Sequence, residues 1–109
     1  MKRRVLKRSG ETVKFNKENI ISTIVKAYKD VHPERGEAIA IDSARFVYQT
    51  NIKPWVLLQK ERKMGADEIQ NIVEIGLMRQ MPEVARAYII YNYEREVSRG
   101  KERVEIDSK

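Results

Sequence analysis

Residues 5–31 read VLKRSGETVKFNKENIISTIVKAYKDV, and this stretch decides the fold. Its first part holds two short runs of β-branched and apolar residues, 5–7 and 12–15, on either side of Ser9-Gly10. Gly10 can adopt the positive φ of a tight turn, so the pattern predicts a β-hairpin. Two strands alone are only marginally stable, and they therefore need a helical layer that covers them.

The second part of the stretch predicts that layer. Asn16 is a suitable N-cap, because its side-chain oxygen can accept a hydrogen bond from an unpaired helix N–H. Apolar residues then recur at helical spacing, which predicts an amphipathic helix over residues 17–31 that ends near His32-Pro33. The apolar face of this helix comprises Ile20, Ile21, Ile24, Val25, Tyr28 and Val31.

A second helix is predicted after Pro33 and Gly36, and its apolar pattern reaches about Asn51. Lys53-Pro54 should break this pattern, because proline lacks the backbone N–H that a helix interior uses. The segment PWVLL, residues 54–58, is then either a short buried segment or an exposed apolar patch.

Two further helices complete the prediction. The third begins at Asp67, where Asp67 and Gln70 have the spacing of a capping box. The fourth begins at Pro82, which suits a first helical position, and it ends near residue 98. Tyr88 and Tyr91 lie three residues apart on this helix, and we expect both to pack inside the bundle.

Together these elements predict an α+β fold in which a small N-terminal β-hairpin packs on a bundle of about four α-helices. A chain of 109 residues is enough for one compact core. We therefore expect a single domain over residues 1–98, followed by a polar, flexible tail over residues 99–109.

The composition excludes several classes of function. The chain has no cysteine and a single histidine, His32, which argues against disulfides, zinc ribbons, thiol nucleophiles and histidine-based metal or catalytic sites. No apolar run approaches the roughly 20 residues of a membrane span, and the basic N-terminus lacks the apolar stretch of a secretory signal. These features favour a cytoplasmic protein that is not an enzyme.

Positive charge is concentrated at the N-terminus. Residues 1–16 carry six of the 22 lysines and arginines against Glu11 alone, while the whole chain has a net charge of +6. A hairpin turn backed by a helix N-terminus offers backbone N–H groups, the positive end of a macrodipole and cationic side chains. This end of the chain therefore predicts an anionic partner, which the residues alone leave open between a nucleotide, a nucleic acid and an acidic protein.

Four blocks of sequence narrow the choice. KRSG at 7–10, VKFN at 13–16, DEIQNIVEIGLM at 67–78 and VARAYIIYNYER at 84–95 follow one another in the order and spacing of the ATP-cone domain. The chain resembles this regulatory module, which is found in ribonucleotide reductases and in the repressor of their genes, over about residues 5–98. The four blocks in register are far more specific than any one of them.

The resemblance implies a site for ATP or dATP, with or without Mg²⁺, beneath a lid formed by the hairpin and the first helix. It implies phosphate contacts from Lys7 and Arg8, a turn at Gly10, and a basic contact from Arg95. The nucleotide-binding residues that it implies are Val5, Lys7, Arg8, Gly10, Lys14, Phe15, Asn16, Asn19 and Arg95.

The chain departs from the family pattern at three positions. Asn19 stands where the family usually carries a lysine, Ala66 where a hydroxyl residue is frequent, and Asn92 where an arginine is common. The resemblance implies an allosteric module that binds ATP or dATP and controls the association state of itself or of a ribonucleotide-reductase-type partner. Two alternatives stay open: a basic nucleic-acid-binding domain, and a degenerate cone that serves only as an oligomerisation module through residues 54–58.

Overall fold

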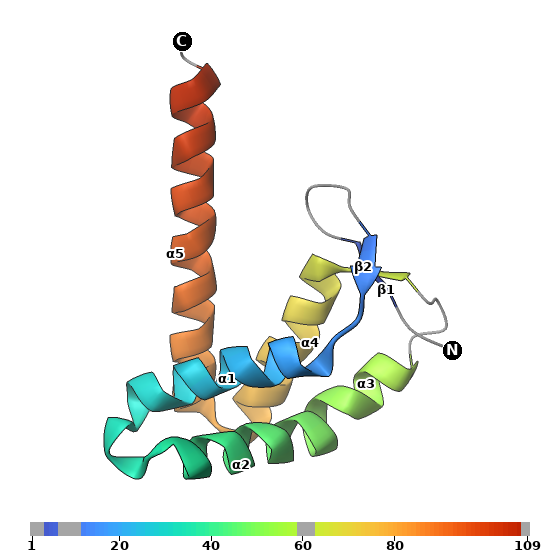
Figure 1. The fold of residues 1–109 in the computed structure, drawn as a ribbon, viewed down its shortest axis with the longest axis vertical. Helices are drawn as coiled ribbons and strands as arrows, with labels where there is room; N and C mark the ends of the chain where they lie inside the picture. The colour runs from blue at the N-terminus through green and yellow to red at the C-terminus, as the bar shows by residue number, and fades with distance from the viewer. Residues whose placement is uncertain (1–3, 7–11, 59–62, 108–109) are drawn as a thin grey trace.

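The computed structural model describes residues 4–6, 12–58 and 63–107, and it has the predicted α+β architecture, with a small sheet at the N-terminal end of a helical base (Figure 1). The elements in chain order are β1 (Arg4–Leu6), β2 (Thr12–Lys14), α1 (Lys17–Val31), the 3₁₀ turn η1 (Pro33–Arg35), α2 (Glu37–Val47), the π turn η2 (Tyr48–Ile52), α3 (Lys53–Leu58), β3 (Lys63–Gly65), α4 (Ala66–Gln80) and α5 (Pro82–Asp107).

The predicted hairpin strands pair antiparallel, with Val5 of β1 opposite Val13 of β2. Its turn lies outside the described residues. A third strand, β3, runs parallel to β1 on its other edge and gives the sheet order β2-β1-β3. β3 was not predicted from the sequence, because Lys-Met-Gly has neither β-branched residues nor an alternating pattern. Its central residue, Met64, is almost completely buried, so this strand fastens the sheet to the core.

The helix predicted over residues 17–31 is confirmed as α1. The backbone N–H of Glu18 donates to Asn16 Oδ1 at 2.9 Å, which confirms the predicted N-cap. The buried face of α1 contributes Ile20, Ile21, Ile24, Ala27 and Tyr28 to the core. Because α1 packs on both α2 and α5, it is the central helix of the base.

The predicted break at Lys53-Pro54 is wrong. α2 continues through the π turn directly into α3, and the N–H of Lys53 donates to the carbonyl of Tyr48, five residues earlier. A π turn widens the helix locally, and it precedes a proline that has no N–H to offer. The helix therefore passes Pro54, and α2, the π turn and α3 form one continuous rod, so that the base consists of four helical rods.

Residues 54–58 satisfy both of the alternatives that the sequence left open. Val56 is buried in the core, whereas Trp55, Leu57 and Leu58 are exposed. The segment is helical, so neighbouring residues point in different directions, and one helix supplies both a core residue and an apolar surface.

α4 begins one residue earlier than predicted, and the predicted cap is wrong. Gly65 occupies the N-cap position without a side-chain hydrogen bond, and Asp67 lies inside the first turn. Along its length α4 packs closely on the π turn at Gly76. A Cβ at this position would lie 3.0 Å from the carbonyl oxygen of Asn51, closer than an ordinary van der Waals contact, so glycine lets the two elements approach this closely.

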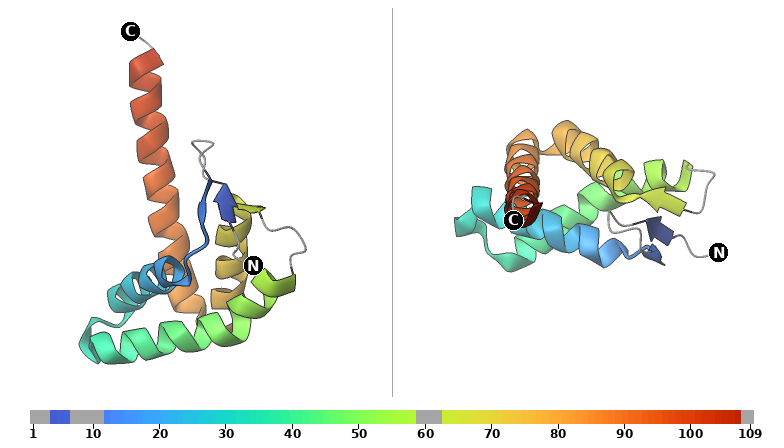
Figure 2. Two further views of the ribbon diagram at one scale, coloured as in Figure 1. Left: turned by 45° about the vertical axis from the view of Figure 1, so that its right-hand side comes forward. Right: turned by 90° about the horizontal axis from the view of Figure 1, so that it is seen from above.

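α5 begins at Pro82 as predicted but continues to Asp107, beyond the expected end near residue 98. The added stretch is rich in charged residues that favour helices and contains a single interrupting glycine, Gly100, which costs only about 1 kcal/mol. α5 packs on α1 and α4 near its start and then rises away from the base (Figure 2). Where the domain ends and a tail begins stays a prediction.

Candidate functional site

The junction between β2 and α1 is the first part of the site. Asn16 has an extended backbone and caps α1 with its side-chain oxygen, and the N–H of Asn19 donates to the carbonyl of Asn16 at 3.2 Å. Both side chains are exposed at the N-terminal end of the helix. The junction therefore places two amides at the positive end of the helix dipole, where anions are favoured.

The strand residues of the predicted site divide between the two faces of the sheet. Val5 and Phe15 are half-buried and pack against the core, whereas Lys14 is exposed. Lys14 lies directly opposite Arg4 in the register of the hairpin. Two cations in this position repel each other, and an anion bound near both would relieve that repulsion.

Three predicted phosphate and turn residues, Lys7, Arg8 and Gly10, lie outside the described residues. Their roles stay predictions.

Arg95 is on α5, away from the strand-to-helix junction. Its guanidinium carbon lies 5.7 Å from the centroid of the Tyr91 ring, a cation–π contact one helical turn apart. The hairpin and α5 rise from the same side of the base, with α1 and α4 between them (Figure 1). Arg95 and the junction therefore stand on separate elements that flank one side of the fold.

A polar cluster that joins α4 and α5 was not predicted from the sequence. Gln70 donates to Glu74 at 3.1 Å, one helical turn apart on α4. Burial raises the pKa of the Tyr88 hydroxyl, the nearby Asn92 side chain acts in the opposite direction, and Glu74 and Arg95 contribute opposing charge effects. The signal that could have found this cluster is the spacing of four residues within each pair, 70 with 74 and 88 with 92.

The side-chain amide of Asn92, which lies in this cluster, is not fully hydrogen-bonded. Among the described residues its Nδ2 is the one buried side-chain polar atom without a hydrogen-bond partner. An unpaired buried donor costs about 1–3 kcal/mol. The position where the chain lacks the family's common arginine therefore holds an unsatisfied polar group.

The two tyrosines of α5 differ from each other. Tyr88 is buried, which confirms that it packs in the bundle, but Tyr91 is 41% exposed and the prediction for it is wrong. The α-helical step turns Tyr91 about 60° away from Tyr88, enough to carry it from the core to the rim of the α1 interface.

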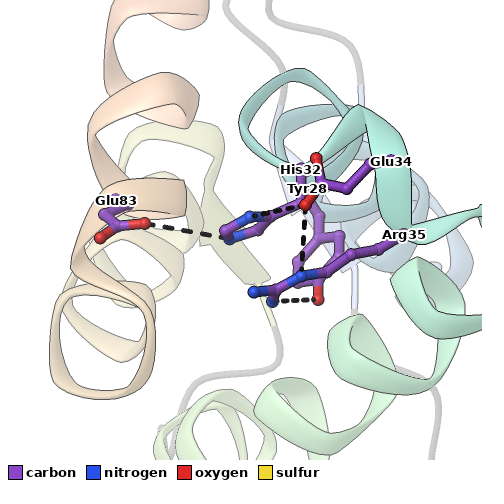
Figure 3. A network of polar contacts seen from close by, with 5 residues as sticks. All are labelled: Tyr28, His32, Glu34, Arg35 and Glu83. Atoms are coloured by element: carbon purple, nitrogen blue, oxygen red, sulfur yellow. Dashed lines mark hydrogen bonds and ion pairs between the residues drawn. The ribbon is translucent and has the colours of Figure 1, made fainter.

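A second polar network joins the end of α1 to the start of α5 (Figure 3). His32 lies between two carboxylates, with its Nδ1 3.9 Å from Glu34 and its Nε2 3.9 Å from Glu83. Arg35 donates to the Tyr28 hydroxyl at 3.1 Å, and this bond lowers the pKa of Tyr28 and raises that of Arg35. These contacts hold the chain reversal between α1 and α2 against α5.

No three histidine, cysteine or carboxylate side chains gather to hold a metal within the described residues. In the same part of the chain, no helix combines the length and the apolar character needed to cross a membrane.

The family assignment follows from comparison with known proteins. The sequence model of the ATP cone domain matches residues 3–97. The chain belongs to the ATP cone domain family. It is also 32% identical over 100 residues to a protein from Haemophilus influenzae (strain ATCC 51907 / DSM 11121 / KW20 / Rd) described as "Anaerobic ribonucleoside-triphosphate reductase".

That alignment covers 89% of the present chain but only 13% of the reductase, so the match concerns one small part of a large enzyme. Domains of this family are typically regulatory modules of ribonucleotide reductases that bind ATP or dATP as allosteric effectors, and they are not catalytic. The resemblance found in the sequence is thus confirmed at the level of the family.

Proposed function

We propose that this ATP cone binds ATP or dATP at the junction of the hairpin and α1, and that the bound nucleotide controls the association state of the chain or of a ribonucleotide-reductase-type partner. The observation that carries the proposal is the junction itself, where Lys14 and Arg4 face each other beside the N-terminus of α1. Cations, backbone N–H groups and a helix dipole at one place suit a polyphosphate.

The predicted nucleotide-binding residues have different roles in this proposal. Lys14, with Lys7 and Arg8 from the hairpin turn, supplies charge to the phosphates. Val5 and Phe15 anchor the strands to the helical core, which keeps the cations in place. Asn16 and Asn19 contribute polar groups at the helix end, and Arg95 supplies a cation from α5. Mg²⁺ would accompany the nucleotide through its phosphates.

Regulation requires that two association states differ in their affinity for the nucleotide, because a ligand that binds both equally shifts no equilibrium. The direct test is calorimetry of the purified chain with ATP and with dATP, each with Mg²⁺, together with light scattering on the same samples. We expect saturable binding and a molar mass that depends on which nucleotide is present. Binding without any change in mass, alone or with a reductase partner, would contradict the regulatory part of the proposal.

The phosphate contacts have their own test. Lys7→Ala, Arg8→Ala and Lys14→Ala should each weaken ATP binding by about 1.5–3 kcal/mol, the cost of a lost charge-assisted contact. Lys53→Ala is the matched control, because Lys53 is an exposed lysine at the start of α3 and belongs to neither strand of the hairpin. Unchanged affinity in all three hairpin variants, with helical circular dichroism preserved, would show that the phosphates bind elsewhere.

A second function is favoured by the exposed apolar residues of α3. Trp55, Leu57 and Leu58 form a surface suited to association between copies or with a partner. Trp55→Ala should then lower the molar mass in light scattering while leaving nucleotide affinity unchanged. A variant with the mass of the parent protein would count against this surface.

A further inference from the structure

The outer side of α5 carries an apolar stripe. Ile90, Tyr93 and Val97 are 46%, 67% and 48% exposed. Ile90 follows the buried Tyr88 by two residues, which is about 200° around the helix, so it points away from the core. Val97 follows Ile90 by seven residues and therefore shares its face. The stripe lies on the side of α5 opposite the buried residues of this helix.

α5 is longer than its contacts with the base require. Its 26 residues extend about 39 Å, but it packs on α1 and α4 near its start, and the rest rises above the base (Figure 2). An isolated helix shorter than about 12–15 residues is only marginally stable in water. A second helix packed on the outer side would cover the apolar stripe and support the projecting part of α5.

Two opposite charges flank Ile90 at equal distances. Arg86 lies four residues before Ile90 and Glu94 four residues after it, so each is about 6 Å from Ile90 along the helix axis. Both side chains are exposed, and neither has an ion pair or a hydrogen bond within the described part of the chain. The outer side of α5 thus presents a row with a cation at one end, an apolar centre and a carboxylate at the other end.

This row is complementary to its own reverse. We propose that a second copy of the chain packs on the outer side of α5, with the two α5 helices antiparallel and Ile90 of each copy at the twofold axis. Arg86 of one copy then lies beside Glu94 of the other, and the same pair recurs on the other side of the axis, because a twofold interface uses the same patch on both copies. A parallel pair in register would instead place like charges opposite each other, so the charges select the antiparallel arrangement.

The exposed tyrosine adds a contact to this arrangement. Tyr93 follows Ile90 by about 4.5 Å along the axis, so its ring lies near Arg86 of the second copy. The guanidinium group can stack on the ring face there, as arginine commonly does on tyrosine. Tyrosine and arginine are also the residue types that are enriched in the centres of protein interfaces.

The inference deepens the proposed function, because it names a surface through which copies of the chain associate. It rests on the proposed function only for the control of that association by a nucleotide. The outer side of α5 is also a different surface from the exposed α3 residues Trp55, Leu57 and Leu58. Variants on α5 therefore test it separately from both the nucleotide site and the α3 surface.

The experiment is sedimentation equilibrium of the full chain, without nucleotide and with ATP or dATP, at concentrations up to about 1 mM. We expect a monomer–dimer equilibrium. Arg86→Glu and Glu94→Arg should each raise the dissociation constant of the dimer at least about tenfold, because two attractive pairs become two repulsive pairs. An equimolar mixture of the two variants should restore the parent affinity, since both pairs between unlike copies are attractive again.

Two matched controls accompany these variants. Lys53→Glu changes the net charge by as much as Arg86→Glu does, but it lies on α3 and should leave the dissociation constant unchanged. Ile90→Glu should weaken the dimer because it places two carboxylates at the twofold axis, whereas Ile39→Glu, at a half-exposed isoleucine of α2, should not. Circular dichroism establishes that each variant keeps its helices.

The orientation of the helices has its own measurement. The chain has no cysteine, so a Val97→Cys variant carries a single nitroxide label. In the antiparallel pair each label lies seven residues from the axis, and the two labels are about 21 Å apart along the helices. Electron–electron dipolar spectroscopy measures this separation. Labels that lie side by side would show a parallel pair and contradict the proposal.

Several outcomes would overturn the inference: a parent chain that stays monomeric in all conditions, single reversals without effect, or a mixture that does not recover the dimer. A mass that is lowered by Trp55→Ala but not by the reversals would assign association to α3 instead. Saturable ATP binding by a chain that stays monomeric would refute the α5 pair and leave the nucleotide site standing. Charge-dependent dimers without any nucleotide binding would do the opposite.

Discussion

The helical base, α1 to α5, and the strand end, β1 to β3, differ in how deeply their side chains are buried. In the base, Ile24, Val73 and Leu77 are completely removed from solvent. At the strand end, three-residue strands are held mainly by half-buried Val5 and Phe15 and by Met64. The base therefore holds most of the stability, and the strand end, which carries the proposed nucleotide contacts, is lightly attached to it. A lightly attached element responds readily to a ligand, because little packing opposes its movement.

The largest effect should come from the centre of the base. Ile24→Ala removes a fully buried side chain from α1 and leaves a cavity, so we expect a loss of about 2–5 kcal/mol in the free energy of unfolding. Urea denaturation followed by circular dichroism measures it. Ile39→Ala is the control, since Ile39 is half exposed on α2 and its replacement should cost well under 1 kcal/mol. Equal losses in the two variants would remove the contrast between core and surface.

The contact between α4 and the π turn comes next. Gly76→Ala places a methyl group 3.0 Å from both the Asn51 carbonyl oxygen and an Ile52 carbon, so the helices must separate at a cost of about 1–3 kcal/mol. The thermal midpoint should fall accordingly. Gly65→Ala is the control, because its Cβ would have only ordinary contacts with Glu68 and its φ is negative. A variant at Gly76 as stable as the parent chain would mean that the helices adjust freely there.

A smaller effect is expected at the strand end. Val5→Ala removes two methyl groups from a half-buried site, which should cost about 1 kcal/mol of stability. The same substitution at Val25, which packs against the core from α1, is the matched control. We expect only Val5→Ala to weaken ATP binding as well, since it loosens the sheet that carries Lys14. Weakened binding in both variants would indicate that the base, rather than the strand end, sets the affinity.

The smallest effect at neutral pH concerns two tyrosines of the base. Burial raises the pKa of Tyr88 above its ordinary value of 10.0, so its contribution to stability is complete below pH 10 and is lost as the pH rises through the folded-state pKa. The hydrogen bond from Arg35 lowers the pKa of Tyr28, so the contribution of this residue to stability is complete above pH 10 and is lost as the pH falls through the lower folded-state pKa.

Tyr88→Phe should therefore reduce the loss of stability in alkali, and Tyr28→Phe should increase it. Urea midpoints measured at pH 8 and pH 10.5 give both changes. Parallel pH profiles for the parent chain and the two variants would show that neither hydroxyl titrates differently in the folded state.

The sequence predicted most of this architecture, because α1 has a clear helical period, a cap at Asn16 and a stop at Pro33. It failed where tertiary contacts overrule local signals. Pro54 is a strong helix breaker, yet the π turn carries the helix past it. β3 forms because Met64 is buried and because the free edge of β1 pairs with it. Neither contact can be predicted from the sequence Lys-Met-Gly.

The candidate site was predictable in part. Its strand residues follow from the resemblance to the family and the Asn16 cap follows from capping chemistry, and the described ones lie together at the junction. A cleft of about 240 Å³ between α1 and α5, lined by Ala27 and Tyr88, could not be predicted in this way, because it depends on which helix lies beside Ala27. That contact joins residues about sixty positions apart in the sequence.

The π turn determines how α3 is rotated about the helix axis, and therefore which residues of α3 face the core. The buried residues Ala40, Ala44, Tyr48, Ile52 and Val56 recur at intervals of four. In an unbroken α-helix, which advances 100° per residue, such a row drifts 40° at each step and would leave the core. Each residue of the wider π turn advances by less than 100°. This smaller step reverses part of the drift, so Val56 again points into the interior. Removal of one residue from Tyr48–Ile52 would turn α3 by about 100° and move Val56 off the inner face. The π turn thus decides which side of α3 faces the solvent.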